Sequence, residues 1–159
     1  MELYFDIDLC VGCHACELAC ALQNHGEKRI NIEVFGGLFP LSGVCRQCEN
    51  SPCVQVCPKE AIKRTGDAVK INENLCIGCR SCSIACPFGN IDFLESRRVS
   101  VKCDECLGRL KEGERPPCAR VCPTGALRFC EYEEMEKVAS TAKRRREMVG
   151  PRIFAWRPK

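Results

Sequence analysis

The spacing of its cysteines constrains this 159-residue chain more than any other feature of the sequence. Of the 17 cysteines, 16 fall into four groups of four. In chain order the groups are Cys10, Cys13, Cys16 and Cys20; Cys45, Cys48, Cys53 and Cys57; Cys76, Cys79, Cys82 and Cys86; and Cys103, Cys106, Cys118 and Cys122. Groups one and three read C-x2-C-x2-C-x3-C, group two widens one gap, and group four opens the same gap into a loop. Any fold of this chain must therefore accommodate four closely spaced groups of thiols.

This spacing is typical of ligands to iron–sulfur clusters. In C-x2-C-x2-C-x3-C, three nearby thiolates hold one [4Fe–4S] cluster and the fourth goes to a neighbouring cluster. Gly12 and Gly78 lie inside the loops of groups one and three, where the lack of a side chain lets the backbone pass close to a cluster. Three groups end in Cys-Pro, and the proline is expected to direct the chain away. The sequence therefore predicts four [4Fe–4S] clusters, with iron bound through the same 16 cysteines, and a role in conducting electrons.

Two other uses of so many cysteines have to be weighed. Zinc sites usually pair two C-x2–4-C units, and groups two and four, taken alone, are compatible with zinc. Groups one and three supply three consecutive ligands at short spacing, which suits zinc poorly. A disulfide framework is typical of small secreted proteins, but the first eight residues show neither a basic stretch nor a long apolar one. We therefore expect reduced, metal-bound thiolates in a cytoplasmic protein.

Composition limits the other classes of function. No apolar stretch approaches the roughly 18 residues of a membrane span, so no membrane span is expected. The formal charge of +3 would fall to about −5 with four clusters, each of which carries −2 with its thiolates. Nucleic-acid binding therefore gains little support, and the basic run Lys143–Arg146 is interpreted as a solvated helix end or a docking patch for an acidic partner. No nucleotide loop, carboxylate pair or nucleophile–base pair stands out, which predicts a non-catalytic protein.

Short strands and helices are expected between and around the cysteine groups. Residues 3–7 and 126–132 are predicted strands, residues 61–72 a hairpin around Gly66-Asp67, and residues 91–94 and 99–101 a second apolar pair. Short helices should begin near the last cysteine of each group, as in Cys16–Leu22. Residues 132–148 predict a surface helix that ends at Gly150-Pro151, followed by an apolar tail over 152–159. The fold class is α+β, with two pseudo-symmetric bacterial-ferredoxin-like dicluster modules.

Several longer sequence segments resemble those of a known protein family. They include Val44–Cys53, Cys76–Cys82, Ala85–Gly89, Lys102–Cys106 and Pro117–Leu127. Together they look like the four-cluster [4Fe–4S] polyferredoxin electron-transfer subunits of dimethyl sulfoxide reductases, formate dehydrogenases and related molybdenum or tungsten enzymes. The resemblance covers about residues 3–130.

The resemblance implies a crossed ligation of the clusters. Site 1 takes Cys10, Cys13, Cys16 and Cys122; site 2 takes Cys103, Cys106, Cys118 and Cys20; site 3 takes Cys45, Cys48, Cys53 and Cys86; and site 4 takes Cys76, Cys79, Cys82 and Cys57. A linear pairing of groups one with two and three with four is the alternative. The 18-residue gap between Cys57 and Cys76 fits a ferredoxin module and favours the crossed scheme.

The expected domain division follows from this pairing. Residues 1–130 form a four-cluster domain, with an outer module from groups one and four and an inner module over 45–101. Residues 131–159 form a C-terminal helix and an extended tail, and the apolar residues Ile153, Phe154 and Trp156 suggest docking. A freely diffusing shuttle would have little use for such a tail, unless it folds back on its own core.

The compact form resembles small subunits beside carbon monoxide dehydrogenases, hydrogenases and tungsten-dependent aldehyde oxidoreductases. The resemblance implies an electron-transfer subunit with a catalytic oxidoreductase partner, and a tungsten or molybdenum pterin enzyme such as an aldehyde oxidoreductase is favoured. A flavin subunit or a ferredoxin could serve the other end. The alternatives are a free polyferredoxin shuttle, or a subunit of a hydrogenase, formate dehydrogenase or carbon monoxide dehydrogenase. His14 is interpreted as a solvent-side residue, His25 as a turn residue and Cys130 as a small buried hydrophobe.

Overall fold

The computed structural model describes residues 2–35, 39–131, 133, 134, 136 and 137 of the chain. The elements are β1 (Glu2–Phe5), α1 (Ala15–Gln23), β2 (Ile32–Phe35), β3 (Phe39–Ser42), α2 (Pro52–Gln55), β4 (Ile62–Thr65), β5 (Ala68–Ile71), α3 (Ser81–Ala85), β6 (Asp92–Leu94), β7 (Val99–Val101), α4 (Pro117–Arg120) and β8 (Leu127–Cys130). Most of the predicted helix over 132–148, and all of the tail over 152–159, lie outside the described residues. The mixture of short strands and helices confirms the α+β class.

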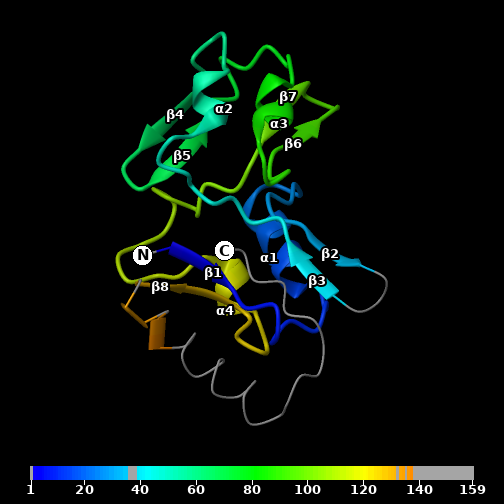
Figure 1. Ribbon diagram of the computed structural model, residues 1–159, viewed down its shortest axis with the longest axis vertical. Helices are drawn as coiled ribbons and strands as arrows, with labels where there is room; N and C mark the ends of the chain where they lie inside the picture. The colour runs from blue at the N-terminus through cyan, green and yellow to red at the C-terminus, as the bar shows by residue number, and fades with distance from the viewer. Residues whose placement is uncertain (1, 36–38, 132, 135, 138–159) are drawn as a thin grey trace.

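The elements gather into two lobes (Figure 1). One lobe contains α2, α3 and the hairpins β4–β5 and β6–β7, and the other contains α1, α4, the β2–β3 hairpin and the β1–β8 pair. All four strand pairs are antiparallel. In the part of the chain that the structure describes, no helix is long and apolar enough to span a membrane.

The two ends of the cysteine-rich region meet in the second lobe. β1 pairs with β8, with Glu2 opposite Cys130 and Phe5 opposite Leu127. The prediction of strands at 3–7 and 126–132 is therefore confirmed, with each strand somewhat shorter than expected. Because β1 precedes group one and β8 follows group four, this pairing brings the first and last cysteine groups into one lobe.

Two hairpins in the first lobe agree with the sequence pattern. β4 and β5 pair around Gly66, whose φ of +59° suits the tight turn. β6 and β7 pair as the second apolar couple, with Asp92 opposite Val101. The sequence analysis missed the β2–β3 hairpin, in which Ile32 lies opposite Ser42. Its signal was Gly36-Gly37 directly after Ile30–Phe35, which begins with alternating apolar and polar residues.

All four helices begin one residue before the third cysteine of their group, at Ala15, Pro52, Ser81 and Pro117. The expectation that they begin near the last cysteine was therefore wrong, although its example, Cys16–Leu22, agrees with α1. α2 and α4 begin at a proline, whose fixed φ suits the first helical position, and α1 and α3 begin directly after a left-handed residue. The prolines that follow the last cysteine of groups two, three and four bear on where the helices end, because the residue before a proline disfavours helical geometry. α2, α3 and α4 end before that cysteine, whereas α1 continues to Gln23 because group one carries Ala21 in place of proline.

Each lobe has a small apolar core built around cysteines. In the lobe with both chain ends, Ile30, Val44 and Leu127 pack with Cys20, Cys103 and Cys118. In the other lobe, Ile62, Val69 and Ile91 pack with Cys82. α1 lies against α4, and α2 lies against α3. The cores therefore converge on the thiols, and apolar side chains alone do not close them.

Candidate iron–sulfur centres

The structure gathers the 16 grouped cysteines around four cavities. One cavity is lined by Cys10, Cys13, Cys16 and Cys122; one by Cys20, Cys103, Cys106 and Cys118; one by Cys45, Cys48, Cys53 and Cys86; and one by Cys57, Cys76, Cys79 and Cys82. Each cavity thus takes three cysteines from one group and the last cysteine of another. These are the sets named above as sites 1 to 4.

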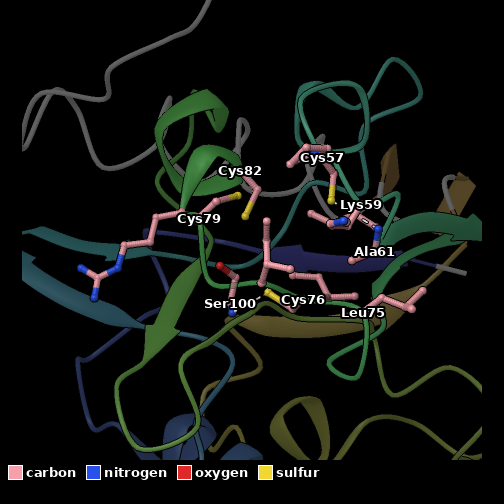
Figure 2. A pocket seen from close by; sticks show the side chains of 13 residues that line it. Cys57, Lys59, Ala61, Leu75, Cys76, Cys79, Cys82 and Ser100 are labelled. Carbon is pink, nitrogen blue, oxygen red and sulfur yellow. Dashed lines mark hydrogen bonds between the residues drawn. The ribbon is translucent and has the colours of Figure 1, made fainter.

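The four cavities are similar in size. Counting the space that opens to solvent, their empty volumes are about 330 Å³ at site 1, 290 Å³ at site 2, 360 Å³ at site 3 and 340 Å³ at site 4. Figure 2 shows site 4 from close by, with the sulfur atoms of Cys57, Cys76, Cys79 and Cys82 facing a common space. Cys57 reaches this space from the end of α2, and the other three come from the loop and helix of group three.

The loops of groups one and three have matching backbone conformations. Gly12 and Gly78 have φ of +65° and +70°, a region that glycine enters at little cost. His14 and Arg80, one residue before α1 and α3, are both left-handed, with φ of 58° and 59°. Reversals on either side of the second cysteine let the chain curl around the cavity, so that three thiols of one group face the same space.

Backbone amides point at several of the thiols. The N–H groups of Arg29 and Ala61 donate to the sulfur atoms of Cys20 and Cys57, each at 3.3 Å. The N–H of Leu127 donates to Cys122 at 3.4 Å, that of Glu105 to Cys103 at 3.4 Å, and that of Ser100 to Cys76 at 3.5 Å. Such bonds stabilise negative charge on sulfur and are one of the levers that set a cluster's reduction potential.

Burial opposes ionisation of the thiols in the metal-free protein. It raises the pKa of Cys118 to about 12 and that of Cys16 to about 11, and it raises the pKa of Cys103 well above its usual value. Cys122 differs, because the N–H of Leu127 and other hydrogen bonds outweigh its burial and lower its pKa. Since only thiolates bind metal, iron has to displace the protons of the buried thiols.

The donor set and the cavities fit iron–sulfur clusters. Four soft sulfur donors around a cavity suit an iron–sulfur cluster or zinc. Among the described residues, no three histidine, cysteine or acidic side chains are placed to hold a single metal ion. The cavities leave room between the thiols, which suits a multi-atom cluster with sulfur ligands on each of its irons.

The remaining candidate residues lie where the sequence suggested. Cys130 is 6% exposed on β8, which confirms it as a small buried side chain. His14 is exposed, and its Nδ1 lies 3.4 Å from a carboxylate oxygen of Glu17. His25, with φ of 56°, lies in the turn after α1.

Sequence reasoning missed two residues beside site 3, Lys102 and Gln47. Lys102 Nζ donates to the sulfur of Cys45 at 3.2 Å, and Gln47 Oε1 accepts from the N–H of Val69 at 2.9 Å. A lysine directly before a C-x2-C unit would ordinarily be expected to point into solvent, so the sequence did not single it out. The one available signal was that Lys102 continues the apolar strand Val99–Val101.

Comparison with known proteins agrees with this geometry. Residues 37–132 match the 4Fe-4S dicluster domain family. The chain belongs to this family. The B subunit of the anaerobic dimethyl sulfoxide reductase of Escherichia coli K12 is 36% identical over 153 residues, covering 84% of this chain and 75% of the relative. Formate hydrogenlyase subunit 2 of the same organism is 33% identical over 185 residues, covering 91% of this chain and 87% of the relative.

A longer relative, the E. coli K12 protein UacF, is 37% identical over 150 residues. The alignment covers 89% of this chain but only 23% of UacF, so the chain spans about a quarter of that protein. The comparisons confirm the resemblance to iron–sulfur electron-transfer subunits of dimethyl sulfoxide reductase and related oxidoreductases.

Proposed function

We propose that this chain relays single electrons through four [4Fe–4S] clusters within an oxidoreductase complex and performs no substrate chemistry itself. The observation that carries the proposal is the set of four cavities of similar volume, each lined by four cysteines. A chain that conducted electrons by any other means would have no use for sixteen thiols arranged in this way.

In this proposal the ligation is crossed, as defined for sites 1 to 4. Sites 1 and 2 form the outer module of a four-cluster domain over residues 1–130, and sites 3 and 4 form the inner module over 45–101. The shared lobes support this division, because β1–β8 joins groups one and four while β4 to β7 surround groups two and three. Residues 131–159 form the docking segment.

Bound clusters supply the one-electron chemistry, and the residues of the chain hold them. The cysteines fix the position of each site, and backbone amides such as those of Arg29, Ala61 and Leu127 stabilise the sulfur charge. The apolar cores around Leu127 and Val69 limit the access of water to the inner side of each site. The protein thus contributes binding, spacing and electrostatics.

The partner in this proposal is a catalytic oxidoreductase subunit, with a molybdenum or tungsten pterin enzyme such as an aldehyde oxidoreductase favoured and a flavin subunit or ferredoxin at the other end. The relative in dimethyl sulfoxide reductase is named as one part of an enzyme. Apolar residues are exposed at equivalent positions of groups one and three, near sites 1 and 4. Val11 and Leu18 of group one are 69% and 65% exposed, and Ile77 and Ile84 of group three are 59% and 87% exposed. Such residues suit two docking faces.

Metal analysis of the anaerobically purified protein tests the central claim. We expect a brown protein with about sixteen irons and matching acid-labile sulfide per chain, four irons for each cluster. About four zincs without sulfide would contradict the proposal. Identification of the proteins that co-purify with the native chain tests the partner, and a chain recovered alone and active as a diffusing carrier would favour a free shuttle.

Replacement of Cys122 by Ala tests the ligation. Since Cys122 lines the cavity of Cys10, Cys13 and Cys16, we expect the variant to lose or alter the site 1 cluster, seen as the disappearance of one electron paramagnetic resonance signal. Cys130→Ala is the matched control, because Cys130 lines none of the four cavities. A defect confined to the cluster of Cys103, Cys106 and Cys118 would refute the crossed scheme.

A further inference from the structure

A buried lysine lies where the two lobes join. Lys102 is 3% exposed and directly precedes Cys103, the first cysteine of group four. Its side chain nevertheless lines the cavity of site 3, which belongs to the other lobe. Lys102 is therefore next to group four of the outer module in the sequence, but its side chain contacts site 3 of the inner module.

The ammonium group of Lys102 has an acceptor for each of its three N–H bonds. Nζ lies 3.2 Å from the sulfur of Cys45, 3.3 Å from Gln47 Oε1 and 2.9 Å from the carbonyl oxygen of Cys103. Gln47 is itself held, because its Nε2 donates to the same Cys103 oxygen at 3.0 Å and its Oε1 accepts from the N–H of Val69. These bonds fix the ammonium against one ligand of site 3.

None of these three acceptors is a carboxylate. A buried ammonium without an anionic partner is strongly disfavoured, so such groups are normally paired. The buried carboxyl of Glu105 also interacts electrostatically with Lys102. The negative charge in contact with Nζ is the Cys45 thiolate, together with the cluster that it would hold. An oxidised [4Fe–4S] cluster with four thiolates carries −2, and one-electron reduction takes it to −3. The position of Lys102 is therefore accounted for by the charge at site 3.

We propose that Lys102 is a positioning residue that raises the reduction potential of the cluster at site 3, an inference that rests on the proposed function. Reduction adds one negative charge to the cluster. A fixed positive charge beside a ligand sulfur stabilises the reduced form more than the oxidised form. Because the ammonium and the sulfur are both removed from solvent, salt screens this interaction less than it would at the surface.

The test compares two variants of the full chain by redox titration monitored with electron paramagnetic resonance. Lys102→Met removes the charge and keeps an apolar side chain of similar length. Gln47→Glu keeps the lysine but places a carboxylate oxygen where Oε1 now lies, 3.3 Å from Nζ. Lys63→Met is the matched control, because that lysine is 65% exposed beside Glu60. The signal of site 3 is identified by its loss in Cys53→Ala.

We expect the midpoint potential of site 3 to fall in both Lys102→Met and Gln47→Glu, by more than the potential of any other site, and to stay unchanged in Lys63→Met. A potential at site 3 that is unchanged in both variants, or an equal shift at all four sites, would overturn the inference. Loss of the site 3 cluster from both variants would also overturn it, since the ammonium would then serve assembly. Four signals and about sixteen irons in the unmodified chain uphold the proposed function in every case.

Discussion

At the scale of single residues, the cysteine loops depend on backbone positions that admit few residue types. Gly78 lies between Cys76 and Cys79 with φ of +70°, and a β-carbon there would lie 2.6 Å from the carbonyl oxygen of Arg98. A contact that short forces one of the two backbones to move. The loop of group three can therefore close against the turn before β7 only when residue 78 has no side chain.

Gly78→Ala is expected to lower the iron content from about sixteen to about twelve per chain, through loss of the cluster at site 4. The left-handed backbone alone would cost about 1–2 kcal/mol, and the clash with Arg98 adds to it. Gly89→Ala is the matched control, because Gly89 has φ of +63° but a β-carbon added there would have nothing within 4 Å. Iron analysis and thermal unfolding under anaerobic conditions measure both effects, and equal losses in the two variants would contradict the role of the clash.

The residues that the sequence revealed are those with a fixed spacing. The sixteen cysteines, Gly12 and Gly78 stand at repeated intervals, so their chemistry could be inferred without coordinates. The contacts of Lys102 with Cys45 and Gln47 could not be inferred, because they join residues 55 to 57 positions apart in the sequence. The position of a buried charge depends on the packing of distant segments, and a local pattern carries no record of that packing.

At the scale of elements, local strand pairs were predictable from the sequence and long-range pairs were not. The β4–β5 hairpin is local and is marked by Gly66, so the alternating pattern was sufficient to predict it. The prolines after three of the groups decide where the helices end, but they do not show where the helices begin. The pairing of β1 with β8 joins opposite ends of the region. The residues supplied two plausible strands, and only the family's crossed ligation suggested that they meet.

Each lobe depends on one large buried side chain beside its cysteines. Leu127, 2% exposed, packs with Cys20, Cys103 and Cys118, whereas Val69, 1% exposed, packs with Cys82. Leu127→Ala is expected to cost about 2–5 kcal/mol, and Val69→Ala about 1–3 kcal/mol. The first variant should release iron faster from sites 1 and 2, and the second from sites 3 and 4.

Timed release of iron to a chelator, followed by electron paramagnetic resonance of the signals that remain, distinguishes the two variants. Each variant serves as the control for the other, because each removes a buried aliphatic side chain from one lobe and leaves the other lobe unchanged. Release from all four sites at one rate in both variants would show that the lobes do not behave as separate cores.

At the scale of the whole molecule, arginines join the two lobes by ion pairs. Arg29, which follows α1, pairs with Glu73 of the other lobe at 3.0 Å and with Asp104 at 3.6 Å. Arg97, before β7, pairs with Glu73 at 2.6 Å and also with Glu27. These pairs therefore link the loop after α1 with two segments of the other lobe, the one after β5 and the turn between β6 and β7.

Arg29→Gln is expected to lower the free energy of unfolding by about 1–3 kcal/mol, because two largely buried carboxylates lose a shared cation. Glu73 keeps its pair with Arg97 and Asp104 keeps its pair with Arg109, so the loss stays below that of an unpaired buried charge. Arg29, Glu73 and Asp104 are only 17%, 25% and 13% exposed, so salt should screen the bridge weakly. Lys63→Gln is the control, since its exposed pair with Glu60 should contribute less than about 1 kcal/mol. Thermal unfolding at two salt concentrations measures both variants, and indistinguishable losses would mean that the bridge adds no more than a surface pair.

Removal of the clusters should unfold the whole molecule. The described cores consist of a few aliphatic side chains that pack against thiols, and the cavities between those thiols would be left without metal. Raised pKa values, such as about 12 for Cys118, show that burial disfavours the thiolates once iron is gone. Treatment with an oxidant and a chelator together should therefore abolish the circular dichroism of the folded chain in step with iron loss, whereas the chelator alone should leave both intact. A chain that kept its circular dichroism after losing all its iron would show that the two apolar cores suffice, and that the clusters contribute electron transfer but little of the folding free energy.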